Sequence, residues 1–229
     1  MKGSESMSYY KNLSAISMND YKEMLTKMDL IKSRAILREN IDKQFLAIQE
    51  QGIENVEQLS NALKSKIKLE QFAKVSGIDM AYLTILIREI NSLLPKANRF
   101  SDLPSLDEKV VKRLESAGYK DTYSIYEQIN DKARLHKLVK ILDIDSDVMD
   151  IIIKYVDISR IRWVNHTFAF VLLKVGYDTV EKIAHADSNA LYAVIKAKND
   201  KEHLYKGNIG IHDMEILIQW ARWVQEYVQ

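Results

Sequence analysis

The phrase GIENVEQL at residues 52–59 returns as GYKDTYSI at 118–125 and as GYDTVEKI at 176–183, and this repetition decides the fold. Each phrase starts with a glycine and an apolar residue, and its fourth position holds Asn55, Asp121 or Thr179. Glycine readily adopts the left-handed conformation that ends many helices, and Asn, Asp and Thr side chains cap the start of the next helix. The phrase therefore predicts, three times along the chain, that one helix ends and another begins.

The similarity extends well beyond the phrase itself. An offset of 66 positions, from Gly52 to Gly118, aligns apolar residues without a gap, and an offset of 58 leads from Gly118 to Gly176. The apolar pairs at the first offset are Leu59 with Ile125, Leu63 with Ile129, Leu69 with Leu135, Phe72 with Leu138, Val75 with Ile141, Ile78 with Ile144, Leu83 with Met149 and Ile87 with Ile153. Matches at a fixed period indicate repeated supersecondary units.

Apolar residues between the phrases recur at helical spacing, and the alternation typical of strands is hard to find. We therefore predict an all-α protein, an array of helical units without a β-sheet. The predicted divisions are a leader and N-terminal helix at 1–33 and helical units at 34–98, 99–157 and 158–229. Because units of this size bury only a small core, neighbouring units should share apolar surface.

The stretch DISRIRWVNHTFAFVLLK at residues 157–174 has apolar residues at the positions that two helices and a tight turn require. It resembles the helix-hairpin-helix motif, in which two helices flank a turn of the form glycine, apolar residue, glycine. The same frame fits Gly77-Ile78-Asp79 and Asp143-Ile144-Asp145 with their flanking apolar residues. The resemblance implies tandem helix-hairpin-helix (SAM-like) units.

Residues 157–225, from Ile158 through DTVEKIAHAD to ILIQWARWV, also resemble the bacterial family called domain of unknown function 4332. That family is itself similar to helix-hairpin-helix domains, and the earlier copies in this chain look like more diverged relatives. The resemblance implies a fold but no activity.

Glycine in a DNA-binding hairpin lets backbone N–H groups point at a phosphate beside a helix N-terminus. Here Trp163 and Asn165 take the places of the two glycines, and Asp79, Asp143 and Asp145 put carboxylates into the other hairpins. Carboxylates at these positions cap a helix and repel nucleic acid. We therefore predict that most of the hairpins are structural.

The third hairpin nevertheless has an edge without acidic residues, and it supplies the first candidate contact residues: Arg160, Arg162, Trp163, Asn165, His166 and Thr167. This edge is either a phosphate-binding site or a solvated turn with two arginines on its rim. Trp163 is either a packed anchor or an exposed stacking surface.

Basic residues recur ahead of the internal hairpin in the first two units. The further candidate contact residues are Lys64, Lys66 and Lys68 in the first unit and Lys132, Arg134 and Lys137 in the second. A basic stripe repeated in this way could track a charged backbone. The alternative is that these residues form solvated helix faces.

Composition removes several classes of function. The 33 basic and 32 acidic side chains leave a net charge of +1, so no global field draws the chain to nucleic acid or membranes. The absence of cysteine excludes disulfides, thiolate nucleophiles and cysteine zinc sites. The five histidines show no metal-ligand spacing, and no phosphate-loop, nucleophile-elbow or dinucleotide motif occurs. We expect no catalysis, cofactor, metal or membrane partner, and a cytoplasmic location.

These observations favour a non-catalytic interaction or scaffold protein whose helical units bind another macromolecule, a protein rather than DNA. A homo-oligomer is an open alternative for that partner. The runner-up is a sequence-nonspecific nucleic-acid-binding protein that uses the third hairpin and the basic stripes. An unrecognised enzyme with a dispersed active site is a weaker third reading.

Overall fold

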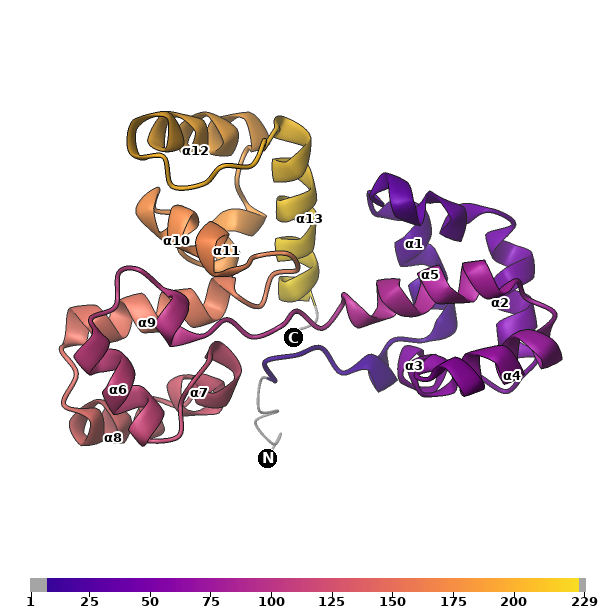
Figure 1. The fold of residues 1–229 in the computed structure, drawn as a ribbon, viewed down its shortest axis with the longest axis horizontal. Helices are drawn as coiled ribbons and strands as arrows, with labels where there is room; N and C mark the ends of the chain where they lie inside the picture. The colour runs from indigo at the N-terminus through magenta and orange to yellow at the C-terminus, as the bar shows by residue number, and fades with distance from the viewer. Residues whose placement is uncertain (1–7, 227–229) are drawn as a thin grey trace. The chain divides into compact units, whose positions relative to one another are not determined.

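The computed structural model describes residues 8–226, which form helices joined by turns (Figure 1). No β-strand occurs within this range, where only two isolated β-bridges are found, so the predicted all-α class is confirmed. The chain divides into two compact units. The N-terminal unit comprises Lys11–Leu94, and the C-terminal unit comprises residues 8–10 together with residues 95–226.

Short helices connected by tight turns build the N-terminal unit. Its elements are η1 (Leu13–Ala15), α1 (Met18–Lys27), η2 (Lys32–Arg38), α2 (Ile41–Gln49), α3 (Val56–Leu63), α4 (Lys66–Ser76) and α5 (Met80–Asn91). α3 packs against α4 and α5, and α1 packs against α2. Arg34 Nε lies 3.1 Å from Glu89 Oε2, which ties η2 to the buried side of α5.

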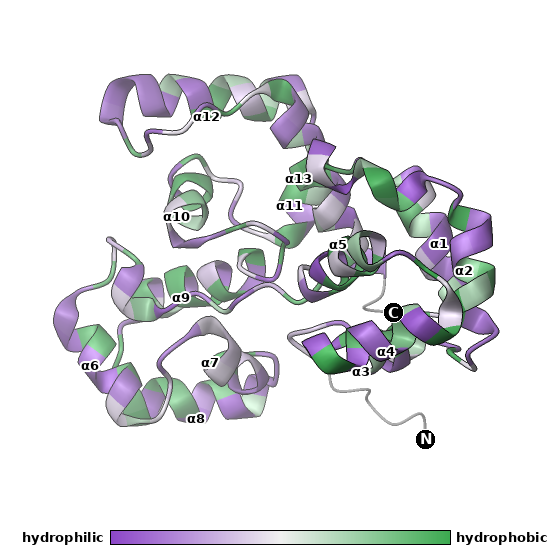
Figure 2. Ribbon diagram, turned by 45° about the vertical axis from the view of Figure 1, so that its right-hand side comes forward, coloured by the Kyte–Doolittle hydropathy of each residue, from purple (hydrophilic) through white to green (hydrophobic). Residues whose placement is uncertain are grey.

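The C-terminal unit contains the other two phrases and the third hairpin. Its elements are η3 (Phe100–Asp102), α6 (Glu108–Ser116), α7 (Thr122–Ile129), α8 (Lys132–Leu142), α9 (Ser146–Ile158), α10 (His166–Lys174), α11 (Val180–Ala184), α12 (Ser188–Glu202) and α13 (Ile211–Glu226). α7 packs against α8 and α9, α10 against α9, and α13 against α11 and α12. Hydrophobic and hydrophilic residues alternate around these helices (Figure 2), as expected for helices with one buried face. Among the described residues, no helix is long and apolar enough to cross a membrane.

Helix and unit boundaries differ in part from those expected. The N-terminal helix expected within residues 1–33 is α1, which ends at Lys27, and residues 1–7 of the expected leader lie outside the described part of the chain. α9 runs through the division proposed between residues 157 and 158, and both sides of that division belong to one compact unit. The threefold division rests on the sequence repeat and stays a prediction.

The three phrases build the same local structure. Gly52, Gly118 and Gly176 have φ values of 77°, 92° and 81°, in the left-handed region where a Cβ atom would be strained. The side chains of Asn55, Asp121 and Thr179 accept hydrogen bonds from backbone N–H groups in the first turns of α3, α7 and α11. Both predictions made from the phrase are therefore confirmed.

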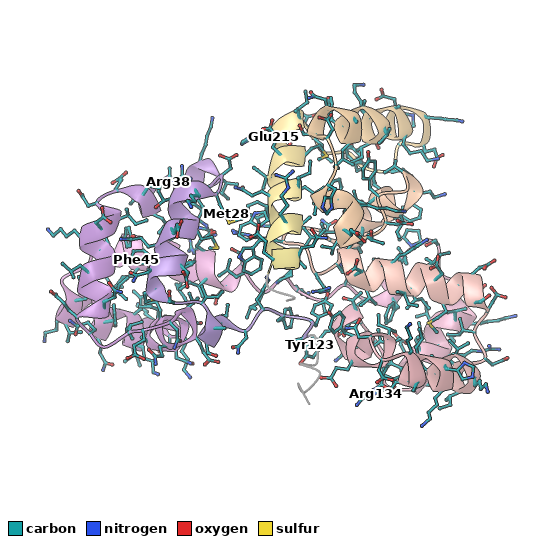
Figure 3. All side chains as sticks on the ribbon, turned by 180° about the vertical axis from the view of Figure 1, so that it is seen from behind. Met28, Arg38, Phe45, Tyr123, Arg134 and Glu215 are labelled. Atoms are coloured by element: carbon teal, nitrogen blue, oxygen red, sulfur yellow. The ribbon has the colours of Figure 1, made fainter. Side chains whose placement is uncertain are left out.

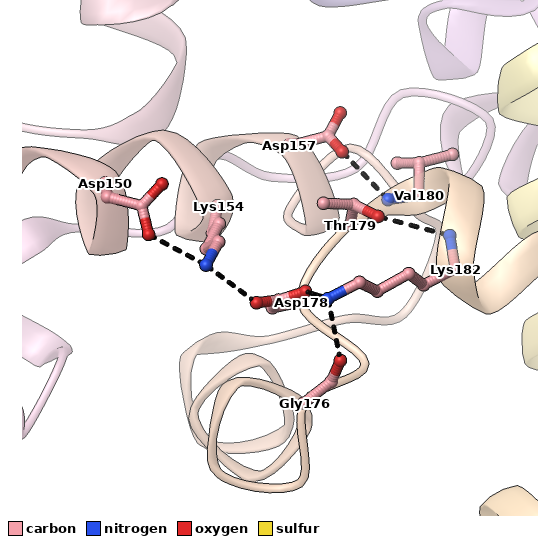
Figure 4. Close-up of polar contacts among 8 residues, drawn as sticks. All are labelled: Asp150, Lys154, Asp157, Gly176, Asp178, Thr179, Val180 and Lys182. Atoms are coloured by element: carbon pink, nitrogen blue, oxygen red, sulfur yellow. Dashed lines mark hydrogen bonds and ion pairs between the residues drawn. The ribbon is translucent and has the colours of Figure 1, made fainter.

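The first N–H group of the helix that starts within each phrase also has a hydrogen-bond acceptor. In the first two copies the acceptor is a backbone carbonyl: Val56 N donates to Ile16 O at 3.0 Å, and Thr122 N donates to Asn98 O at 2.9 Å. In the third copy Val180 N donates to the carboxylate of Asp157 at 2.8 Å (Figure 4). A side chain at the end of α9 thus replaces the backbone bridge of the earlier copies.

Asp178 holds the third phrase against α9 (Figure 4). This buried carboxylate accepts from Lys154 Nζ at 2.9 Å and from Lys182 Nζ at 2.5 Å. Burial alone would raise the pKa of the Asp178 carboxyl, but the hydrogen bonds from Lys182 and Lys154 outweigh it, so the pKa is lowered overall. The carboxylate stays ionised near neutral pH and ties α9 to α11.

Candidate interaction surfaces

The third hairpin is a tight, internally bonded turn. Trp163 has a φ of 68°, Val164 is buried, and Asn165 caps α10 by accepting from Phe168 N at 2.9 Å. Asn98 stabilises the turn from outside, since its Nδ2 atom lies 2.9 Å from both Ser159 Oγ and Val164 O. The turn therefore keeps its shape without glycine because side chains and the buried valine fix it.

The two arginines of this hairpin fold back onto the protein and do not lie on a solvated rim. The Arg160 side chain is 9% exposed, pairs with Asp157 at 3.1 Å and lies over the Tyr126 ring at 5.0 Å. Arg162 is 4% exposed. Its guanidinium carbon lies 4.2 Å from the ring centroid of Trp163 and 4.3 Å from that of Trp220. Both cations therefore contribute to packing.

Trp163 combines the two roles considered for it. Its ring covers Arg162 and meets Trp220 edge to face at 6.2 Å, yet the residue remains 44% exposed. Asn165 is exposed, and His166 and Thr167 are half-buried in the first turn of α10. The hairpin thus offers solvent one indole and a helix start, without a free cation from either arginine.

α8 carries three of the candidate residues, Lys132, Arg134 and Lys137, and a further cation, Lys140. All four are exposed, and Figure 3 labels Arg134 on this helix. Within residues 8–226 none of the four forms an ion pair with a carboxylate. Asp131 caps the helix and accepts from Arg134 N, which together with the nearby charges of Arg134 and Lys137 lowers the pKa of its carboxyl.

The lysines of α12 show the contrasting arrangement. Lys196 lies 2.5 Å from Asp200, and Lys198 lies 2.6 Å from Glu202, each one helical turn apart. These pairs neutralise the charge of α12 locally. α8 therefore differs from α12, two of whose lysines pair with carboxylates.

The equivalent basic residues of the N-terminal unit lie at the start of α4. Lys64, Lys66 and Lys68 are exposed, Lys66 lies 3.9 Å from Glu70, and Lys68 donates to Asn61 O at 3.2 Å. This group is less strongly cationic than that of α8, because Glu70 lies within it.

Two aliphatic residues of the repeated frame are exposed, although the apolar pattern predicts that they pack. Val75 at the end of α4 is 64% exposed, and Ile141 at the end of α8 is 75% exposed. Their neighbours in the frame, Phe72 with Ile78 and Leu138 with Ile144, are buried. Sequence reasoning missed the two residues because it followed the repeat and did not place each position on its helix face.

Each exposed aliphatic residue stands two turns beyond a cation. Val75 follows Lys68, and Ile141 follows Arg134, by seven positions, so the members of each pair lie on nearly the same side of the helix. We call the exposed sides that carry these pairs the α4 face and the α8 face. A cation and an aliphatic side chain on the same exposed side of a helix suit an acidic surface that contains an apolar residue.

No group of three His, Asp or Glu side chains able to hold a metal ion occurs among the described residues. The histidines lie apart: His136 is on α8, His166 on α10, and His212 pairs with Glu215 at 3.2 Å on α13.

Comparison with known proteins identifies one family. The model of the family described as Domain of unknown function (DUF4332) matches residues 104–226, which extends from the turn before α6 to the end of α13. The match reaches further toward the N-terminus than the resemblance at residues 157–225, and it includes α8. No curated protein and no solved structure matches the chain.

Proposed function

The chain belongs to the family described as Domain of unknown function (DUF4332), and we propose that it is a non-catalytic interaction protein that binds an acidic protein partner through the α8 face. The proposal includes a reading of its turns as degenerate helix-hairpin-helix elements. Gly77, Asp143 and Trp163 have positive φ values, each precedes a buried apolar residue, and each is followed two positions later by a helix cap.

One observation carries the proposal: Ile141 is exposed at the end of a helix whose four cations have no carboxylate partner within residues 8–226. Burying such a side chain against a partner is worth about 1.5–3 kcal/mol. The unpaired cations contribute less to affinity, but they accelerate encounter with an acidic surface and orient it. The two effects together favour a partner that offers both carboxylates and an apolar contact.

Nucleic acid is the second candidate, and the four unpaired cations of α8 are the observation that favours it. One feature weighs against it, because a phosphate backbone offers no apolar surface to Ile141. The carboxylates of Asp143 and Asp145 in the turn after α8 repel a phosphate and an acidic peptide alike, so they do not separate the two candidates. An acidic protein segment therefore fits the α8 face better than DNA does.

Isothermal titration with a synthetic probe tests the proposal directly. The probe is a helical peptide of about four turns with glutamates and one leucine per turn on the same face. We expect the wild-type chain to bind it and the variants Ile141→Glu and Lys137→Glu to bind at least about tenfold more weakly, equivalent to about 1.4 kcal/mol. Val194→Glu is the matched control, because Val194 is another exposed β-branched residue, on α12.

Two results would contradict the proposal. One is the absence of peptide binding to the wild-type chain at millimolar concentration. The other is equal weakening by Ile141→Glu and Val194→Glu, because a general effect of added negative charge would then explain the loss. Circular dichroism of each variant checks that the helices are retained.

A further inference from the structure

The α4 face repeats the α8 face in the other compact unit. Val75 and Ile141 each stand two residues before a left-handed residue, Gly77 with a φ of 69° and Asp143 with a φ of 47°. A buried isoleucine follows in both cases, and an aspartate then caps the next helix. The local structure around the two exposed side chains is therefore the same.

Helix propensity does not favour a β-branched aliphatic residue at this position. A β-branched side chain has a lower helix propensity than the long polar residues that usually cover a solvated face. A single exposed aliphatic residue is ordinary. The same exposure at corresponding positions of two units, beside buried partners in both, indicates that the exposed side chain itself is needed.

The surroundings of Val75 match those of Ile141 in charge as well. Lys68 corresponds to Arg134, and Lys74 adds a further exposed cation next to Val75. At the position that corresponds to Lys137 of α8, the N-terminal unit has Gln71. The α4 face therefore carries one cation fewer, and we expect the same type of ligand to bind there more weakly than at α8.

Each face alone is too small for tight binding. One aliphatic side chain with screened ion pairs buries far less than the roughly 1,200 Å² at the lower end of stable interfaces. Two such faces in one chain change this, because the second contact with a linked ligand becomes intramolecular. Avidity of this kind strengthens binding by about 100- to 10,000-fold when the linker can span both faces.

We propose that the α4 and α8 faces are two sites of the same specificity, and that the partner is a protein which presents the same acidic segment with an apolar residue at least twice. This inference rests on the proposed function of the α8 face and adds a second site to it. The chain is then a bivalent connector.

The experiment compares the single acidic peptide described above with a tandem peptide, in which two copies are joined by a flexible Gly-Ser linker. Linkers of about 20, 40 and 60 residues are used, because the reach of such a chain grows roughly with the square root of its length. Titration of the full chain should give two single peptides bound per chain. The tandem peptide should bind with one molecule per chain, at least about tenfold more tightly than the single peptide.

Two variants assign the sites. Val75→Glu and Ile141→Glu should each leave one single peptide bound and abolish the advantage of the tandem peptide. Leu46→Glu on α2 and Val194→Glu on α12 are the matched controls, since both residues are exposed aliphatics outside the two faces. Lys68→Glu provides a second test of the α4 face that leaves Val75 in place.

The outcomes separate the two proposals. One outcome is that a single peptide binds per chain, and that Ile141→Glu abolishes this binding whereas Val75→Glu does not. The α8 site would then stand, and the second site would be refuted. If neither peptide binds, both proposals fail. An affinity gain for the tandem peptide that survives Val75→Glu and Lys68→Glu would also overturn the inference, because the second contact would then lie elsewhere.

Discussion

The hydroxyl oxygen of Tyr9 lies 2.7 Å from Thr122 Oγ1, so the beginning of the described chain is held by a helix that starts 113 positions later. Tyr9 also donates to Ser159 O at 3.3 Å, and its ring meets Tyr126 edge to face at 5.3 Å. Burial raises the pKa of Tyr9, which keeps the hydroxyl neutral at physiological pH. Residues 8–10 thereby belong to the C-terminal unit, although Lys11–Leu94 form the other unit.

Replacing Tyr9 should destabilise the C-terminal unit selectively. Tyr9→Phe removes the hydrogen bonds and should cost about 1 kcal/mol, and Tyr9→Ala should cost about 3–5 kcal/mol. Urea unfolding followed by tryptophan fluorescence measures this, because Trp163, Trp220 and Trp223, the three tryptophans of the chain, all lie in the C-terminal unit. Tyr123→Phe is the control, with an expected change below about 0.5 kcal/mol, since Tyr123 is exposed. An equal effect of Tyr9→Phe and Tyr123→Phe would show that the buried hydroxyl adds no stability.

The sequence predicts the helical class and the local structure of the phrases because both depend on short-range physics. A glycine followed by a capping residue specifies one helix end and one helix start, whatever lies elsewhere in the chain. Gly118 and Asp121 behave as this rule requires. The packing of residues 8–10 on α7 could not be predicted in the same way, because it depends on a contact between distant parts of the chain.

The candidate contact residues were harder to predict for a related reason. An arginine in a polar turn has a long side chain that can reach solvent or fold back over an aromatic ring, and the local sequence does not distinguish the two. Arg160 and Arg162 fold back over Tyr126 and Trp220, which lie on other helices. The exposure of Ile141 escaped notice because apolar residues in a repeat are normally buried. In contrast, the basic residues of α8 are exposed, which both alternatives for them require.

Asp178→Asn should weaken the link between α9 and the third phrase. We expect a loss of about 1–2 kcal/mol at neutral pH, discounted because Lys182 is half exposed. Since the pKa of Asp178 is lowered by folding, its contribution is complete above the unfolded pKa of about 4 and disappears as pH falls through the folded value. The difference between wild type and variant should therefore be constant from about pH 5 to 8 and shrink below about pH 4. Asp150→Asn is the control, and a difference that grows at low pH would contradict the assignment.

His203→Gly should stabilise the C-terminal unit. His203 has a φ of 51° at the C-terminal end of α12 and is exposed, so glycine would relieve left-handed strain without losing a packed side chain. We expect a gain of about 0.5–1 kcal/mol in the free energy of unfolding. His136→Gly, in the middle of α8, should lower it by a similar amount, because glycine is unfavourable inside a helix. A loss of stability in both variants would argue that His203 is not strained.

Arg162→Ala should destabilise the third hairpin and change the fluorescence of the tryptophans beside it. Removing a buried guanidinium that contacts two indole rings should cost at least about 2 kcal/mol. Arg134→Ala on the exposed side of α8 is the control and should change stability by less than about 0.5 kcal/mol. If Arg162→Ala leaves both stability and fluorescence unchanged, the guanidinium does not pack on these rings in solution. Because both arginines pack against aromatic rings, a binding assay with Arg160 or Arg162 variants would not separate the loss of a ligand contact from partial unfolding of the hairpin.

DNA binding, the second candidate function, is better tested on α8 than on the third hairpin. We expect a labelled 20-base-pair duplex, a probe whose length suits about two helical turns, to bind only at low salt. Four phosphate contacts from Lys132, Arg134, Lys137 and Lys140 would give a log–log salt slope of about −3.6, and replacing Arg134 and Lys137 by alanine should flatten it by about 1.8. Replacing Lys196 and Lys198, which pair with carboxylates on α12, should leave the slope nearly unchanged. Submicromolar binding at physiological salt would contradict the proposed acidic protein partner if the double alanine variant of Arg134 and Lys137 lost it and the Ile141→Glu variant kept it. Nucleic acid would then be the better candidate. The α8 face would then act through its charge alone, because Ile141 would contribute nothing to the complex.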